Sequence, residues 1–245
     1  ALYELAHSSF IIGDNDKALV LFQKVMDEFP KSSYVPKCLD GSGLIYFNNK
    51  QDDLAMAAYK KVVQEYPGTA EARTALQGIK NIYVSKGNSA EYLSYASTIP
   101  FADNTRSAQD SVTYEAAEVV YMKGDPAQSL QVMSDYLDKF PDGSFVLNAT
   151  FYKSECQYRL KKSEWALKGY ETVIAAPRST FTETSLVRAA GLYFQVPDYQ
   201  KALDTYLALQ STSELTANLV EAEIGKMRCY YKLKDYDNAF VAANK

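Results

Sequence analysis

Apolar and polar residues along this chain alternate in blocks that predict pairs of helices. Between Leu39 and Phe47, small and apolar residues fall three or four positions apart, as they do on one face of a helix. The polar run at 50–53 interrupts this spacing, which resumes over 54–63. Pro67 then disfavours helical geometry in the residue before it. The stretch therefore predicts a helix, a tight turn and a second helix.

This block pattern repeats along the whole chain with a period of about 37 residues. One position in the second predicted helix sets the register, because it is mostly small and an apolar residue follows it in every copy. Self-similarity at this period is typical of stacked helical hairpins, so the sequence predicts an all-α solenoid of about seven copies. The register positions are Ala18, Ala55, Tyr92, Ser129, Ala166, Ala202 and Ala239.

Two further columns predict how the helices pack. A small residue in the first helix lets the two backbones approach closely, and a larger residue four positions after the register position fills the space beside it. Lys80 and Met227 break the small column, so we expect looser packing in copies three and seven. The small column is Ala6, Gly43, Ala117, Ser154 and Ala190, and the large column is Phe22, Tyr59, Met133, Tyr170 and Tyr206.

The predicted copies form one domain with an irregular point in the middle. Lys80, a short second helix over 90–99 and the polar linker after Pro100 coincide, so a hinge is predicted at 100–107. Because the chain opens and ends inside repeats, we expect it to be a fragment of a longer protein. The copies span about 1–30, 31–67, 68–100, 107–141, 142–177, 178–212 and 213–245.

The order of residues within each copy resembles the tetratricopeptide repeat (TPR). A small residue, Tyr, a Gly-Asp or Lys-x-Asp turn, Ala-Leu, an aromatic residue and Pro recur in that order over the whole chain. The resemblance implies a right-handed α/α superhelix that binds protein or peptide partners. The runs 22–32 and 59–69 are also similar to bacterial cell-envelope TPR proteins, such as outer-membrane assembly lipoproteins and Tol–Pal-associated factors. That similarity favours a periplasmic or envelope location, with a cytoplasmic one as the alternative.

Composition and motifs narrow the classes of function. A net charge of −4 with scattered basic residues disfavours nucleic acid, and no apolar run approaches the length of a membrane span. No Gly-rich phosphate loop or metal-spaced Cys or His pair occurs, so we expect no cofactor, no metal and no enzyme activity. The acidic clusters 52–53 and 235–237 are predicted to cap helices. The three cysteines lie too far apart to pair and are predicted to be buried: Cys38, Cys156 and Cys229.

One aromatic column is a candidate binding surface. It lies twelve residues into each copy and reads Phe10, Phe47, Tyr121, Tyr158, Phe194 and Tyr231, with Val84 in copy three. Packing within the hairpins explains these rings, and so does a concave groove that takes a peptide; the sequence leaves both open. The groove interpretation adds Tyr3, His7, Tyr114, Glu118, Phe151, Glu155, Arg159 and Arg228.

The family also contains proteins that clamp a C-terminal carboxylate with lysines and asparagines. The corresponding positions here hold Tyr3, His7, Asp40 and Leu44, so this chemistry is not implied. Two functions remain. The first is a non-catalytic scaffold that holds a peptide or protein partner in the groove, in a bacterial envelope complex. The second is a spacer or oligomerisation arm of a larger protein whose activity lies in flanking segments.

Overall fold

The computed structural model describes residues 1–244, and all regular secondary structure in that range is helical. Lys245, the last residue of the predicted seventh copy, lies outside the described residues. The helices are α1 (Leu2–Ile11), α2 (Asn15–Glu28), α3 (Val35–Asn48), α4 (Asp52–Glu65), α5 (Ala70–Ser85), α6 (Ser89–Ala96), α7 (Arg106–Met122), α8 (Pro126–Lys139), α9 (Val146–Arg159), α10 (Ser163–Ala175), α11 (Thr182–Gln195), α12 (Tyr199–Thr212), α13 (Thr216–Lys232) and α14 (Tyr236–Ala243).

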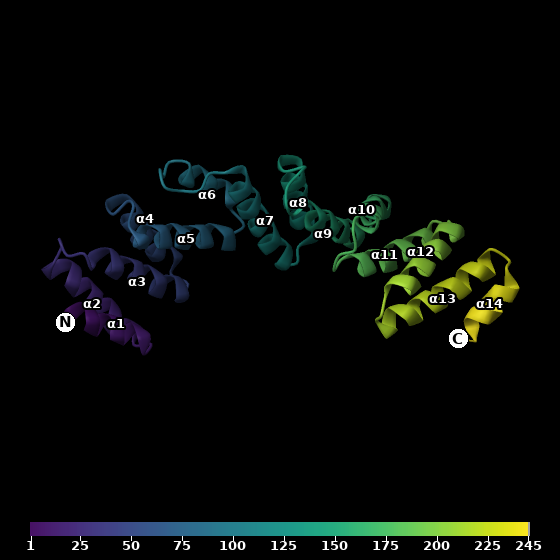
Figure 1. Ribbon diagram of the computed structural model, residues 1–245, viewed down its shortest axis with the longest axis horizontal. Helices are drawn as coiled ribbons and strands as arrows, with labels where there is room; N and C mark the ends of the chain where they lie inside the picture. Colours follow the sequence, from purple (N-terminus) through teal and green to yellow (C-terminus); the bar gives the residue numbers. More distant parts are fainter. Residues whose placement is uncertain (245) are drawn as a thin grey trace. The chain divides into compact units, whose positions relative to one another are not determined.

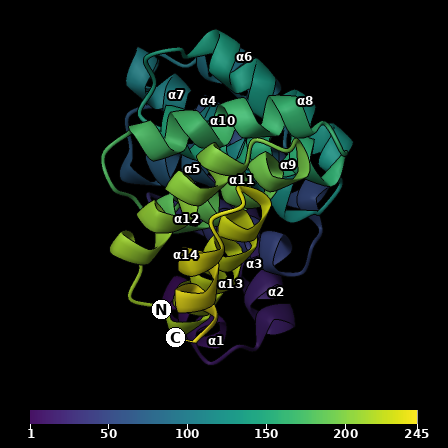
Figure 2. The same cartoon turned by 90° about the vertical axis from the view of Figure 1, so that its right-hand side faces the viewer.

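The helices pair as hairpins from α1–α2 to α5–α6 and from α9–α10 to α13–α14, and the second helices recur with the period read from the sequence. The second helices begin at residues 15, 52, 89, 126, 163, 199 and 236, which are 37 residues apart except for one step of 36. Figure 1 shows α3 with α4 and α11 with α12 as such pairs, and Figure 2 shows α13 beside α14. First helices of neighbouring hairpins also touch, as α3 does with α5 and α11 with α13. The predicted all-α solenoid fold is confirmed.

The chain divides into two compact units, Ala1–Val119 and Val120–Lys245. The first unit holds two apolar clusters, one around Phe22 between α1 and α3 and one around Tyr59 that extends to α7. The second holds one cluster around Tyr170 and Tyr206 that runs from α9 to α13. The boundary falls inside α7, and the hinge at 100–107 stays a prediction.

The register column is buried throughout, as predicted. Ala18, Ala55, Ala166 and Ala202 have no exposed surface. The large column beside it shows why small residues are needed: a Cβ on Gly43 would lie 2.5 Å from the Tyr59 ring, within the same hairpin. The sequence therefore sets the distance between paired helices through this one contact.

Copies three and seven approach the preceding hairpin through a second glycine position. A Cβ on Gly78 would lie 2.6 Å from the ring of Tyr59, and a Cβ on Gly225 would clash with the ring of Tyr206. Each glycine lies two residues before the larger residue that breaks the small column. Lys80 itself turns to α7, where its Nζ lies 2.8 Å from Glu115 Oε2.

Of the two acidic clusters predicted to cap helices, one provides an N-cap and the other does not. Asp235 caps α14, because its Oδ1 accepts from the backbone N–H of Asn238 at 3.2 Å. The prediction of a cap at 52–53 was wrong: Gln51 is the N-cap of α4, and Asp52 lies in the first turn. There a carboxylate is favoured by the helix dipole, and Asp52 Oδ2 also lies 3.3 Å from Lys86 Nζ.

The short helix predicted over 90–99 is α6, which ends earlier, at Ala96. The Ser97 and Thr98 hydroxyls donate at 2.7 Å to the carbonyls of Ser94 and Tyr95, which satisfies the last turn without further helix. An irregular segment, 97–105, follows before α7 begins.

Candidate functional site

A pocket of about 250 Å³ opens on the first-helix face of unit 1. Three successive first helices contribute to it, because α1 precedes α3 in the stack and α3 contacts α5 directly. We call it the first-helix pocket. It is lined by Tyr3, His7 and Phe10 from α1, Phe22 from α2, Lys37, Asp40, Gly41 and Leu44 from α3, and Ala70, Glu71 and Thr74 from α5.

Rings from α1 form one wall of the first-helix pocket. Tyr3 stacks on exposed His7, with ring centroids 5.8 Å apart and planes 9° apart. Tyr3 also stacks on Tyr34, with ring centroids 4.4 Å apart, and the His7 centroid lies 6.5 Å from that of Phe10. The spacing of three and four residues along α1 places these side chains in one row. Two of the predicted groove residues, His7 and Phe10, therefore lie side by side in the wall of this pocket.

Asp40 gives the first-helix pocket its most unusual group. Its Oδ1 is buried and has no hydrogen-bond partner among residues 1–244. Burial, and then the nearby Glu71 carboxylate, raise the pKa of Asp40 from 3.8 to about 6. A carboxylate one period after Tyr3, on the same face of the first helix, is the sequence signal that points to Asp40.

The first-helix face of unit 2 carries a carboxylate with a complete set of partners. Glu155 is buried in α9 and accepts from the Tyr170 hydroxyl at 2.5 Å. Arg188 of α11 donates to both of its oxygens, through Nε at 3.1 Å and Nη2 at 3.4 Å. The Arg188 guanidinium also lies over the Tyr158 ring at 4.7 Å. Glu155 and Tyr158 are thus together, through an arginine that the sequence reading missed.

This hydrogen bonding has electrostatic consequences. Burial, and then the hydrogen bond to Glu155, raise the pKa of Tyr170 far above its usual value, so the phenol stays a donor. The hydrogen bond to Glu155 likewise raises the pKa of Arg188. The network holds α9, α10 and α11 together, which is a structural task.

A second group of predicted residues meets beside this network. Tyr121 stacks on Tyr152 with centroids 4.3 Å apart, and the exposed Arg159 guanidinium lies 5.7 Å from the Tyr121 ring. Phe151 is buried and stacks on Phe181 at 4.6 Å. Tyr121 is half-buried and Arg159 is exposed, so a partner could reach both side chains, whereas Phe151 is part of the core.

The remaining predicted residues are dispersed. Phe194 and Tyr231 pack against tyrosines at the start of their own second helices, with centroids 5.3 Å from Tyr199 and 5.7 Å from Tyr236. The contact supports the packing interpretation for the half-buried Phe194, whereas Tyr231 is 61% exposed. Phe47 is half-buried, and Lys50 Nζ lies 5.9 Å from the centroid of its ring. The hydroxyl of buried Tyr114 donates a hydrogen bond to Glu118 at 2.8 Å. Arg228 is exposed.

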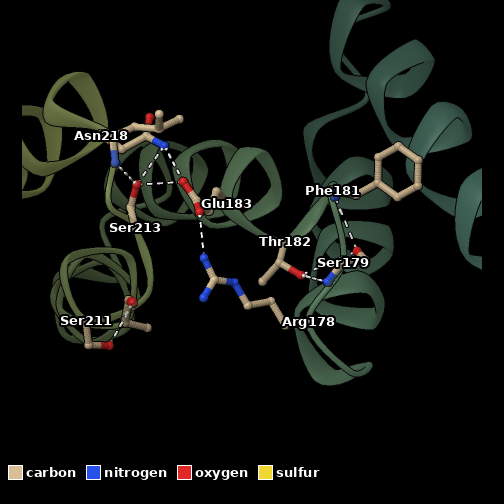
Figure 3. Close-up of polar contacts among 10 residues, drawn as sticks. Arg178, Ser179, Phe181, Thr182, Glu183, Ser211, Ser213 and Asn218 are labelled. Atoms are coloured by element: carbon tan, nitrogen blue, oxygen red, sulfur yellow. Dashed lines mark hydrogen bonds and ion pairs between the residues drawn. The ribbon is translucent and has the colours of Figure 1, made fainter.

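A polar cluster at the linkers of unit 2 was not expected from the sequence. Glu183 accepts from Ser213 Oγ at 2.6 Å, from Asn218 Nδ2 at 2.9 Å and from Arg178 at 3.1 Å (Figure 3). Hydrogen bonding, first of all from Ser213, lowers the pKa of Glu183. Since Ser213 and Asn218 come from the next linker and helix, the cluster ties two successive hairpins together.

Other candidate chemistry is limited to single residues. Among residues 1–244, no group of three or more His, Cys, Asp or Glu is placed to hold a metal ion. None of the described helices is both long and apolar enough to cross a membrane. The three cysteines are buried as predicted, and burial raises the pKa of each thiol to about 11: Cys38, Cys156 and Cys229.

Comparison with known proteins finds both sequence and structural similarity. Residues 1–32 and 38–69 match the tetratricopeptide repeat family model. The C-terminal part of a TPR repeat-containing protein from Cytophaga hutchinsonii is 16% identical, with a TM-score of 0.53 over 98% of this chain and 92% of that chain. A tetratricopeptide repeat protein from Parabacteroides merdae is 14% identical, with a TM-score of 0.43 over 98% and 89%.

A third solved structure, PilF of Pseudomonas aeruginosa, is 15% identical, with a TM-score of 0.42 over 89% of this chain and 92% of that chain. Among curated proteins, none matches the chain significantly. By sequence, residues 1–32 and 38–69 are thus two tetratricopeptide repeats, and the chain as a whole resembles a TPR protein in its fold.

Proposed function

We propose that this protein is a non-catalytic scaffold that binds a segment of a partner protein in the first-helix pocket of unit 1. The observation that carries the proposal is the buried Asp40 oxygen without a hydrogen-bond partner, set in a pocket lined by three successive first helices. The repeat fold supports the general role, because stacked helical hairpins offer extended surfaces for protein partners.

The chemistry of the pocket favours a basic group on the partner. A buried acceptor without a donor costs about 1–3 kcal/mol, which a bound donor removes. The lining has two carboxylates, Asp40 and Glu71, and one lysine, Lys37. Its net negative charge favours a cation, so an Arg or Lys side chain fits better than a neutral amide. Arginine fits best, because its planar guanidinium also stacks on rings such as those of Tyr3 and His7.

The size of the pocket favours one side chain of a longer segment over a small molecule. About 250 Å³ lies below the roughly 300–1,000 Å³ typical of small-molecule sites. The wall of rings continues along α1 to Phe10, where an apolar neighbour of the basic residue would pack. We therefore expect a recognition motif of one arginine beside one apolar residue.

Selection from a displayed random-peptide library tests this function. We expect peptides enriched on the whole chain to contain arginine beside an apolar residue. Their affinity should fall at least about tenfold in Asp40→Ala, which removes a charge-assisted hydrogen bond, and in Phe10→Ala, which removes the apolar contact. Asp53→Ala is the matched control, since this aspartate is exposed on α4.

Two results would overturn the proposal. One is a set of enriched peptides that binds Asp40→Ala and Phe10→Ala as tightly as the native chain. The other is binding that maps to unit 2 alone in hydrogen-exchange protection. Circular dichroism on each variant checks that a loss of binding does not come from unfolding.

The bacterial envelope complex is a finer part of the proposal and is supported by the resemblance of 22–32 and 59–69 alone. Cell fractionation tests it, and recovery of the protein in the cytosol alone would contradict it. The spacer or oligomerisation arm stays the alternative, and a stable oligomer in light scattering with no peptide selected would favour it.

A further inference from the structure

A second groove lies in unit 2 between the second helices α8 and α10, with α9 contributing to its lining. Its volume is about 610 Å³. Leu130 comes from α8, Lys153, Gln157 and Leu160 come from α9 and the residue after it, and Lys162 and Trp165 come from the start of α10. We call it the Trp165 groove. It belongs to no part of the first-helix pocket proposed above.

The Trp165 groove lies on the opposite side of α9 from the predicted peptide surface. Successive residues of a helix advance by about 100°, so Phe151, Glu155 and Tyr158 share one side. Lys153 and Gln157 point roughly half a turn away from them. Helix α9 therefore uses one side for the Glu155 network and presents the other side to the Trp165 groove.

The groove is basic although the whole chain is acidic. It is lined by two lysines and by no carboxylate of the described residues, whereas the chain has a net charge of −4. Neither Lys153 nor Lys162 forms a salt bridge within residues 1–244. A third lysine, Lys168, holds its Nζ 5.2 Å from the Trp165 ring centroid. Positive charge here is thus available to a partner.

Trp165 supplies a large apolar surface in the same groove. It is the only tryptophan of the chain and is 61% exposed, while the register residue beside it, Ala166, is fully buried. Tryptophan is enriched at binding hot spots, because one rigid ring offers a large contact area. Leu130 and Leu160 add aliphatic surface, and Gln157 adds an amide to the polar part of the lining.

We propose that the Trp165 groove binds an acidic protein segment, in which an apolar side chain packs on Trp165 while flanking carboxylates pair with Lys153 and Lys162. This site adds a second interaction surface to the scaffold, and it does not depend on the partner of the first-helix pocket. Charge complementarity selects the occupant: a lysine-bearing groove without carboxylates attracts an anionic partner.

A protein segment fits the groove better than a nucleic acid does. Nucleic-acid sites neutralise many phosphates with an extended basic surface, whereas this groove has two lining lysines within a net-acidic chain. The aliphatic residues beside Trp165 also match a Leu-like side chain, for which a phosphate backbone offers no counterpart.

Fluorescence of Trp165 tests the proposal on the whole chain, because this single tryptophan lies in the site. The probe is a synthetic peptide of glutamates and leucines with the leucines on one helical face and no aromatic residue. We expect a saturable change in tryptophan emission with a Kd below about 1 mM that weakens with added salt. The same peptide with lysine in place of glutamate should give no saturable change.

Variants locate the binding. Lys153→Glu with Lys162→Glu should weaken binding at least about tenfold, since two attractive charges become repulsive. The matched control is Lys17→Glu with Lys61→Glu, which makes the same change in net charge at exposed positions of α2 and α4. Trp165→Ala, followed by anisotropy of a labelled peptide, should weaken binding by about 30-fold. Circular dichroism checks the fold of each variant.

Each other outcome would overturn the proposal. The groove is not the binding site of the glutamate peptide if the peptide causes no saturable change in emission. The same conclusion follows if the control substitutions weaken peptide binding as much as the groove substitutions do. Equal binding of the lysine peptide would remove the charge argument. If a single-stranded oligonucleotide binds the native chain more tightly than the glutamate peptide and loses binding in the groove variant, the groove recognises nucleic acid instead.

Discussion

Asp40 in unit 1 and Glu155 in unit 2 are carboxylates on first helices, yet their surroundings differ. Glu155 accepts hydrogen bonds from Tyr170 and Arg188 and is fully used inside the fold. Asp40 keeps one buried oxygen without a partner and has its pKa raised to about 6. A buried carboxylate with partners offsets the cost of its burial, whereas an unsatisfied one destabilises the fold until a donor binds.

The same contrast separates the two candidate surfaces. In unit 2, the predicted groove residues near α9 are largely engaged with each other, which supports the packing interpretation there. In unit 1, His7 and Phe10 border a pocket that is also lined by Asp40, whose buried Oδ1 is unpaired.

Arg188→Met should produce the largest loss of stability. It leaves the Glu155 charge buried without its cation, while methionine keeps most of the aliphatic packing. Breaking a fully buried pair costs about 3–5 kcal/mol, and because the Arg188 side chain is 36% exposed, we expect a loss of about 2–3 kcal/mol in the free energy of unfolding. Chemical denaturation followed by circular dichroism measures it.

Arg178→Met provides the control for that loss. Its guanidinium pairs with Glu183 but is 60% exposed, so the cost should be about 0.5 kcal/mol or less. Equal costs at Arg178 and Arg188 would show that the Glu155 network contributes no more than a surface pair.

Gly78→Ala tests whether unit 1 is merely packed more loosely than unit 2. The new Cβ would lie 2.6 Å from the ring of Tyr59, which is 3% exposed, so α4 and α5 must separate. We expect a net loss of about 1–2 kcal/mol, since overpacking outweighs the gain in helix propensity. Thermal unfolding measures the change.

Gly191→Ala is the matched substitution in unit 2. No atom lies within 4 Å of its Cβ position, so the helix propensity of alanine should raise stability by about 0.5–1 kcal/mol. If both substitutions stabilise the protein, α4 and α5 are loosely packed at Gly78. The difference between the units would then reflect looser packing in unit 1.

Tyr170→Phe isolates the hydroxyl contribution to the unit 2 network. It removes one donor to Glu155 and leaves the ring packing intact, so stability should fall by about 1 kcal/mol. Tyr92→Phe in unit 1 is the comparison, because Tyr92 is also a buried tyrosine of a second helix, although it stands at the register position and makes no hydrogen bond to Glu155. A change of less than about 0.5 kcal/mol is expected there. Similar losses at both positions would contradict the role of the hydroxyl.

Asp40→Asn should give the smallest effect, and one that depends on pH. With a pKa raised from 3.8 to about 6, ionised Asp40 destabilises the fold above pH 6, and this cost declines as the pH falls to 3.8. The asparagine variant should thus be more stable than the native chain at pH 7 by up to about 1 kcal/mol, after allowance for partial exposure. The difference should disappear near pH 3.8.

Unfolding curves across that pH range measure the difference, with Asp53→Asn as the exposed control. A native chain more stable than Asp40→Asn at pH 7 would show that Asp40 has a partner, and the contrast with Glu155 would then fail.

Much of the fold follows from the sequence. The period of 37 residues gave the helical hairpins, their starts and the burial of positions such as Ala55, because small residues at a fixed spacing are required wherever two helices meet. The aromatic column stays open between the two interpretations: Phe194 lies against Tyr199 at its own turn, whereas Phe10 borders a pocket.

What only the tertiary structure decided is which polar and aromatic groups have partners. Glu155 is satisfied by residues 15 and 33 positions away, and a repeat pattern does not specify such pairs. The contact of Gly78 with Tyr59, and the position of Leu130 beside Trp165 in one groove, likewise depend on how neighbouring hairpins stack. The sequence alone determined the repeat because local spacing controls helix packing, while hydrogen bonding between hairpins depends on distances that only the folded chain sets.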